Sequence, residues 1–419
     1  MSLTPQESTH DTFAALVLRS IVVALFCTFC NSPLDGSVEH ILLSALGGRK
    51  TSAKVICSTH NNAFGSTIDL ALSSQLTYFS NILAIKTGRR EDAPTLRNVM
   101  TVNNQRVDVL PGGRMVAKTR IESAEPTQVD GQPPSTERTI RISASSSESL
   151  KRLIPVYLKR YKKTAGDLKD AIAVERLEPG ALINFTISLG DEPALRCVAK
   201  MGLLLLASAI GTEQVRGDDT AGLRKFILDG SGDWDGLRLD FETEFEMPAA
   251  HAALPAYCHR IGVVADPSAG LAYAQVQLFG AFRYSVILSE RWAGSAVGLQ
   301  YAVDPVTGTG GDERVTAKAA VTATEIKARS ESAEDIGTRC RTVWGAVRER
   351  SNAILIDEVI NESMASAFAG LKEGDEICAE VIGRLAEQVA MRFFARTRGV
   401  PFETPIDVQQ LVGDDKTKS

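Results

Sequence analysis

The chain has 419 residues, of which 44% are hydrophobic and 23% charged, and its formal net charge is −5. This length is more than one ordinary core holds, so we expect two or three domains of globular composition. The acidic balance argues against a protein that coats nucleic acid, although it leaves room for a local basic site. The seven cysteines are odd in number and widely spaced beyond Cys57, which favours a reducing, cytoplasmic compartment over a disulfide framework.

The first strongly apolar segment covers residues 13–26 and is interrupted by Arg19. It is too short to span a bilayer, and no basic residues of the kind that open a secretory signal precede it. We expect a helix or strand that packs against the segment after it, with a signal anchor as the alternative. No membrane partner is therefore expected.

Two short pairs of metal-ligating residues follow, Cys27-x2-Cys30 and, after 26 intervening residues, Cys57-x2-His60. Each pair can place two donor atoms on one edge of a tetrahedron, and two such pairs complete a structural zinc site. The alternative is that Cys27 and Cys57 are ordinary small buried residues. The repeated spacing favours zinc.

An acidic residue with a histidine, two adjacent glycines and an asparagine lie between and after these pairs: Glu39-His40, Gly47-Gly48, His60-Asn61 and Gly65. In this order, the residues resemble the HNH endonuclease superfamily, the ββα-metal nucleases, and within it the resolvase-type branch with zinc knuckles. The resemblance covers about residues 25–85. It implies a small zinc-stapled ββα-metal module, in which the two glycines allow a tight turn or a close backbone approach.

The resemblance also implies a catalytic arrangement. Hydrolysis of a phosphodiester bond requires an activated water molecule and stabilisation of the charge on the phosphate. His40 would accept the proton from the attacking water, while Glu39 and Asn61 would hold one Mg²⁺ or Mn²⁺ through oxygen atoms. The zinc on Cys27, Cys30, Cys57 and His60 would be structural and would hold the β-ribbon to the helix.

Three positions depart from the family pattern. His60 replaces the fourth cysteine, Glu39 stands where resolvase-type members often have aspartate, and residues 51–57 lack the middle asparagine that orients the base. Asp69 lies eight residues after Asn61. It reads either as a carboxylate on the surface of a helix, the interpretation favoured here, or as an outer partner of the site.

Basic residues occur in two stretches. Arg49, Lys50 and Lys54 lie inside the module and are candidates for phosphate contacts. The second stretch, residues 151–163, has six basic residues, no acidic ones and two interleaved tyrosines. It reads equally well as a helix that contacts DNA and as the solvated face of an amphipathic helix. The candidate contacts there are Lys159, Arg160, Lys162 and Lys163.

The remaining elements follow in chain order. Residues 97–121 read as a β-hairpin, 123–140 as a linker, 194–211 as a buried core helix and 259–289 as consecutive strands, and the chain from about residue 313 reads as mostly helical. The predicted class is α+β, with a larger mixed α/β region after the module and a mostly helical C-terminal part. The predicted domains are residues 1–90, 91–140, 141–312 and 313–419.

The pattern favours a metal-dependent endonuclease acting on DNA, and by resemblance such enzymes serve in phage defence or mobile elements. The alternative is a non-catalytic, zinc-stabilised nucleic-acid-binding or regulatory protein, which the missing middle asparagine and the acidic net charge favour. A third interpretation makes the zinc purely structural in an interaction protein. The sequence leaves the oligomeric state open, a homodimer included.

Overall fold

The structure is a computed structural model. It describes residues 25–86, 93–102, 106–117, 120–124, 139–143, 147–162, 183, 187–188, 190–231, 234–239, 248–329, 332–372 and 374–398. Most of the apolar segment of residues 13–26, residues 125–138 of the predicted linker, and Lys163 lie outside these residues.

The N-terminal module begins with a short antiparallel β-ribbon followed by two helices. Strand β1 (Glu39–His40) pairs with β2 (Thr51–Ser52), and η1 (Ser44–Leu46) lies between them. Helix α1 (Ser58–Ser66) and helix α2 (Ile68–Ile82) come next.

The two glycines between the strands have the role that the sequence indicates. Gly47 adopts a left-handed conformation with φ of 92°, which favours glycine. A Cβ atom on Gly48 would lie 2.0 Å from the carbonyl oxygen of Leu42, so only glycine fits this close approach. The predicted tight turn and close backbone approach are both confirmed.

A six-stranded antiparallel sheet forms the centre of the protein, in the order β13-β12-β9-β10-β11-β8. Its strands are β8 (Leu237–Leu239), β9 (His259–Asp266), β10 (Leu271–Leu278), β11 (Phe282–Ser289), β12 (Val297–Val303) and β13 (Gly310–Arg314). Strands β9, β10 and β11 are buried almost throughout, because side chains on both faces of the sheet are covered.

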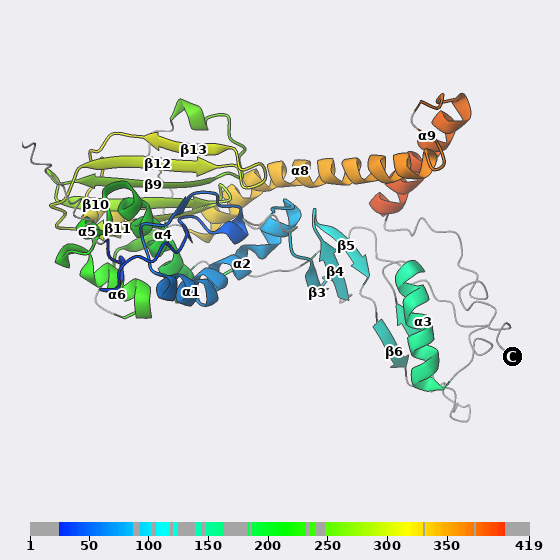
Figure 1. Ribbon diagram of the computed structural model, residues 1–419, viewed down its shortest axis with the longest axis horizontal. Coiled ribbons are helices and arrows are strands. Elements are labelled where there is room, and N and C mark those ends of the chain that lie inside the picture. Colours follow the sequence, from blue (N-terminus) through cyan, green and yellow to red (C-terminus); the bar gives the residue numbers. More distant parts are fainter. Residues whose placement is uncertain are drawn as a thin grey trace, which may run out of the picture.

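Helix α4 (Glu192–Ile210) packs across strands β9, β10 and β11 on one face of the sheet, and α2 of the module packs against α4 (Figure 1). A Cβ atom on Gly202 would come within 2.7 Å of the Cβ of Ala274, so this glycine lets the helix approach β10 closely. Helix α4 is long and apolar enough to cross a membrane by length and composition, but 67% of its apolar window is buried inside the protein. It is the predicted core helix.

Shorter elements complete the body around the sheet. Helices α5 (Thr212–Val215) and α6 (Ala221–Asp229), with η3 (Asp218–Thr220), follow α4, and η4 (Ala249–His251) precedes β9. Helix α7 (Ala323–Ala328) packs against β11 and β8. There Ile326 joins a second apolar cluster with Val264 and Tyr273.

A second region extends away from this body (Figure 1). It contains the meander β3 (Leu96–Met100), β4 (Arg106–Leu110) and β5 (Arg114–Ala117), the pair β6 (Arg120–Ala124) and β7 (Thr139–Ser143), and helix α3 (Ser147–Tyr161). The predicted hairpin of residues 97–121 is therefore confirmed, with a third strand added. The predicted boundary at residue 140 falls inside β7, and the domain boundaries as a whole stay a prediction.

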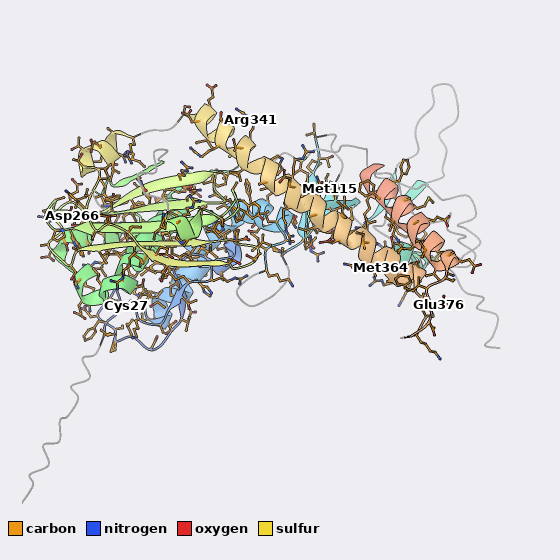
Figure 2. The ribbon with its side chains drawn as sticks, turned by 90° about the horizontal axis from the view of Figure 1, so that it is seen from above. Cys27, Met115, Asp266, Arg341, Met364 and Glu376 are labelled. Atoms are coloured by element: carbon orange, nitrogen blue, oxygen red, sulfur yellow. The ribbon has the colours of Figure 1, made fainter. Side chains whose placement is uncertain are left out.

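Helix α8 (Ala333–Ala367) connects the two regions and leads to α9 (Ala379–Arg398), as Figure 2 shows along the line from Arg341 to Met364. Near its start, the Trp344 ring stacks on Tyr78 of α2, with ring centroids 6.0 Å apart. Further along, the hydroxyl of Ser351 donates to the carbonyl oxygen of Gly112 in the β4–β5 turn at 2.7 Å. The mixed α/β class and the helical C-terminal part are confirmed.

Candidate active site and metal centre

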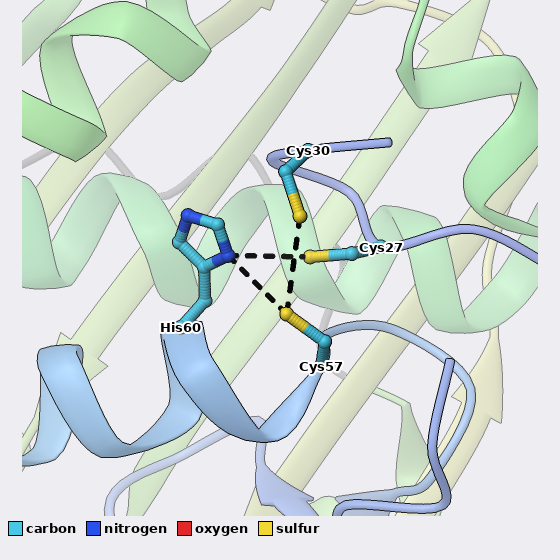
Figure 3. Close-up of side chains that lie close together, drawn as sticks. All are labelled: Cys27, Cys30, Cys57 and His60. Atoms are coloured by element: carbon cyan, nitrogen blue, oxygen red, sulfur yellow. Dashed lines mark hydrogen bonds between the residues drawn. The ribbon is translucent and has the colours of Figure 1, made fainter. Parts of the chain in front are cut away.

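Three cysteines and one histidine converge at the start of α1 (Figure 3). Cys27 and Cys30 lie in a turn held to the module by the backbone hydrogen bond from Thr28 to the carbonyl of Val55, 3.0 Å long. Cys57 caps the N-terminus of α1, and His60 lies in its first turn. Their four donor atoms lie within 4.8 Å of one another. The structure thus brings both predicted pairs together.

The distances between these donor atoms suit a tetrahedral zinc ion. The Nδ1 atom of His60 lies 3.6 Å from Cys27 Sγ and 3.4 Å from Cys57 Sγ, and Cys30 Sγ lies 3.9 Å from Cys57 Sγ. Zinc bonds of usual length at tetrahedral angles give edges of about 3.6 Å between N and S and about 3.8 Å between two S atoms. A disulfide would need about 2.05 Å. The donor set therefore fits Zn²⁺.

The electrostatics of Cys27 and His60 agree with this role. Burial raises the pKa of the Cys27 thiol to about 11, so a metal ion is what allows it to become a thiolate at neutral pH. Burial also lowers the pKa of His60, which keeps its imidazole neutral and able to bind a metal.

Strand β1 places the predicted catalytic pair on opposite faces of the ribbon, because side chains alternate along a strand. Glu39 is 3% exposed and points into the protein, while His40 is half-buried beside it. Burial lowers the pKa of His40, and the positive charges of Lys200 and Arg49 lower it further. A neutral imidazole at the edge of the module is suited to accept a proton.

The carboxylate of Glu39 has a partner that the sequence did not reveal. Its Oε1 atom accepts a hydrogen bond of 2.6 Å from Nζ of Lys200, which lies in the middle of α4 and is 0% exposed. The same ammonium group donates to the carboxylate of Asp69 at 2.7 Å, and it lies 5.5 Å from the centre of the Phe64 ring. Glu39, Lys200 and Asp69 form one buried cluster, which we call the lysine cluster.

Burial raises the pKa of the Glu39 carboxyl, Lys200 opposes this rise, and the negative charge of Asp69 adds to it. Burial alone would lower the pKa of Lys200, but the attraction of Asp69 and Glu39 outweighs it and raises the pKa, so the ammonium stays protonated. Cys197, one turn earlier on α4, donates its thiol to Oδ1 of Asp69 at 3.2 Å. The interpretation of Asp69 as a surface carboxylate is therefore wrong, because its side chain is 15% exposed and pairs with a buried lysine.

Asn61, the other predicted oxygen ligand, is held in place through its amide nitrogen. Its side-chain amide donates to Ser37 Oγ at 2.9 Å and to the carbonyl oxygen of Val38 at 3.0 Å. These bonds tie α1 to the residue that precedes β1. A divalent cation needs exposed oxygen ligands with waters around them. The buried, ion-paired carboxylate of Glu39 does not fit that need, and the predicted Mg²⁺ or Mn²⁺ site at Glu39 and Asn61 stays a prediction.

The basic residues of the module lie near its ribbon. The backbone N–H groups of Arg49 and Lys50 donate to the hydroxyl of Tyr301 on β12, at 3.3 and 3.1 Å. The ammonium of Lys50 pairs with Asp312 on β13 at 2.5 Å, while Lys54 is exposed. After Lys200, Arg49 is the charged residue that lowers the pKa of His40 most.

The basic stretch at residues 151–163 does not meet His40. Its described residues form α3, which stands apart from the module in Figure 1. Lys159, Arg160 and Lys162 are exposed, and Tyr157 and Tyr161 pack with their rings 4.9 Å apart. The helix is amphipathic, and the choice between a DNA contact and a solvated face stays open.

Lys200 is the functional residue that the sequence analysis missed. The signal was present, because a single lysine interrupts the apolar run of residues 197–207, and a charged residue inside a buried helix requires a partner. The identity of that partner was not readable, since Glu39 lies 161 positions earlier in the chain.

Residues 27–77 match a family model described as HNH endonuclease. No curated protein and no solved structure matches the chain. The matched range contains both metal-ligating pairs, the β-ribbon with Glu39 and His40, and all of α1. The resemblance to HNH endonucleases inferred from the sequence is confirmed for this module, and the match suggests a nuclease-type family.

Proposed function

We propose that the module of residues 27–86 hydrolyses phosphodiester bonds of DNA, with His40 as the general base. The observation that carries this proposal is the position of His40. His40 is half-buried on β1, next to Glu39 of the lysine cluster, and the ribbon lies between the two metal-ligating pairs in the chain. The match to HNH endonucleases supports the reaction class.

The chemistry follows from the groups at this edge. The neutral imidazole of His40 takes a proton from a water molecule as the water oxygen bonds to phosphorus. The bond to the leaving oxygen breaks, and this oxygen takes a proton from solvent water to become a hydroxyl group. Arg49 and the exposed Lys54 supply positive charge close to the ribbon for a phosphate backbone. Zn²⁺ bound by the four converging residues would hold α1 to the turn of residues 27–30 and would take no part in proton transfer.

Plasmid nicking by the full-length, zinc-loaded protein tests the proposal. We expect His40→Ala to lose about 10²-fold to 10⁴-fold in cleavage rate, the usual contribution of a general base. Thr51→Ala is the matched control, because Thr51 lies directly opposite His40 in the ribbon and is exposed. Equal cleavage by wild type and His40→Ala would contradict the assignment.

A second candidate is a nucleic-acid-binding protein that does not cleave. The specific observation in its favour is that the Glu39 carboxylate is buried and paired with Lys200. This candidate predicts DNA binding that weakens steeply with salt, without nicking under Mg²⁺ or Mn²⁺. Binding and nicking measured on the same preparation separate the two functions.

A further inference from the structure

We propose that the ammonium of Lys200 is the resident cation of the Glu39 carboxylate and occupies the place in which a divalent metal ion would otherwise bind. Lys200 is then a positioning residue that fixes the strand carrying His40. The inference deepens the proposed function and rests on it for the role of His40. It concerns the lysine cluster alone and makes no use of the zinc site.

The contacts leave the carboxylate of Glu39 committed to Lys200. The N···O distance of 2.6 Å is a short charge-assisted hydrogen bond, and both side chains are at most 5% exposed. A second carboxylate, that of Asp69, holds the same ammonium at 2.7 Å. Two acidic groups that converge on one small cation form the kind of oxygen set that binds Mg²⁺ or Mn²⁺.

A metal ion cannot join this cluster while Lys200 is in place. It would bring a second cation into a buried site where charges interact strongly, and it would have to shed most of its waters to enter. The ammonium is also part of the chain, so its local concentration does not depend on the solution. Burial and covalent attachment together favour lysine over a free ion at this carboxylate.

The cluster has a consequence for His40. Glu39 and His40 are adjacent on β1, so fixing one side chain inside the protein fixes the face from which the other projects. Lys200 lies on α4, which packs against the sheet. The position of His40 is therefore fixed relative to the core of the protein. Any divalent ion that assists at the phosphate is held by atoms other than those of Glu39.

Titration of the full-length, zinc-loaded protein with Mn²⁺, followed by electron paramagnetic resonance of the free ion, tests the proposal without reference to activity. We expect wild type and Glu39→Gln to bind Mn²⁺ equally. We expect Lys200→Ala, which leaves two carboxylates facing the vacated space, to gain one Mn²⁺ site per chain. Adding Glu39→Gln to Lys200→Ala should remove this new site.

Two results would overturn the proposal. One is a Mn²⁺ site in wild type that Glu39→Gln weakens tenfold or more. The other is a folded Lys200→Ala protein, with full zinc content and native circular dichroism, that gains no Mn²⁺ site. If Lys200→Ala does not fold, the comparison of wild type with Glu39→Gln decides the question by itself.

Failure of this inference and failure of the proposed function give different results. Mn²⁺ bound through Glu39 in wild type, with nicking that depends on His40, would remove only the role of Lys200. Equal nicking by wild type and His40→Ala, with no Mn²⁺ bound through Glu39, would remove only the assignment of the base. The two readouts are independent because one counts bound ions and the other counts broken strands.

Discussion

The module is anchored at two places that differ in kind. At the zinc-binding residues, four donor atoms that lie within 34 positions of the sequence converge on one point. In the lysine cluster, two carboxylates of the module meet an ammonium that comes 131 and 161 positions later in the chain. The first anchor closes the module on itself, and the second joins it to the core. Local closure and attachment to the core are thus separate functions of separate residues.

Loss of the zinc-binding residues should destabilise the protein most. Cys57→Ser should abolish zinc binding and unfold residues 27–86, since structural zinc contributes on the order of 10 kcal/mol of folding free energy. Metal analysis and hydrogen exchange over the module measure both consequences. Cys378→Ser is the control, because Cys378 is exposed and lies outside the site. A Cys57→Ser protein that keeps one zinc and native exchange would contradict the assignment of the ligands.

Breaking the second anchor should cost less. Lys200→Met leaves two carboxylates buried without their cation, and we expect a loss of about 3–5 kcal/mol in the free energy of unfolding by denaturant. Lys225→Met, at an exposed position of α6, should change it by less than about 0.5 kcal/mol. Combining Lys200→Met with Glu39→Gln and Asp69→Asn should recover most of the loss, and no recovery would argue against a charge effect.

A third contact joins the module to the sheet, and it involves an uncharged side chain. His259 on β9 is fully buried, donates from Nε2 to the carbonyl oxygen of Leu46 at 2.8 Å, and accepts at Nδ1 from the N–H of Phe279 at 3.0 Å. Burial lowers its pKa from the usual 6.5 to about 4. The uncharged ring is therefore the form that the folded protein holds.

The pH dependence follows from that shift. Above pH 6.5 both states carry the neutral ring, and between pH 6.5 and 4 only the unfolded chain takes up the proton. Stability should therefore fall across this window, by about 3 kcal/mol for the full shift. Denaturant unfolding at pH 7, 5.5 and 4 measures it. His259→Gln should be less stable at pH 7 but should lose less on acidification, and equal losses would contradict the assignment.

The smallest effect belongs to the exposed contact between Lys50 and Asp312. Asp312 is 45% exposed at its side chain, so Asp312→Asn should change the free energy of unfolding by less than about 1 kcal/mol. The change should shrink further at high salt. A loss as large as that of Lys200→Met would mean that surface charge, and not the buried cluster, attaches the module to the sheet.

The parts of the fold that depend on local sequence were predictable. The spacing of the cysteine pairs predicted the zinc-binding cluster, the apolar run predicted α4, and the two glycines predicted the close turn after η1. The runs on either side of the turn at residues 266–270 likewise predicted strands β9 to β11. In each case the interaction lies within a few turns or strands of the residues that encode it.

Contacts between distant segments were not predictable. The sequence around Asp69 predicts a helix but not the ion pair with Lys200, because this pair depends on how α2 packs against α4. The amide nitrogen of Asn61 donates to Ser37 and Val38, and these contacts could not be read from the local sequence around Asn61. Helix α3 lies away from the module in Figure 1, and no local pattern encodes that position.

Helix α8 meets three parts of the protein in turn: α2 through Trp344, the β4–β5 turn through Ser351, and α9 through Glu358. Its 35 residues span about 52 Å at 1.5 Å per residue. Each residue also advances the helix by about 100° of rotation. One residue inserted between Ser351 and Glu358 would rotate α9 by about 100° around the axis of α8. Four inserted residues would rotate it by about 400°, which leaves α9 about 40° from its original direction. The phase of this one helix therefore sets the direction in which the C-terminal part faces.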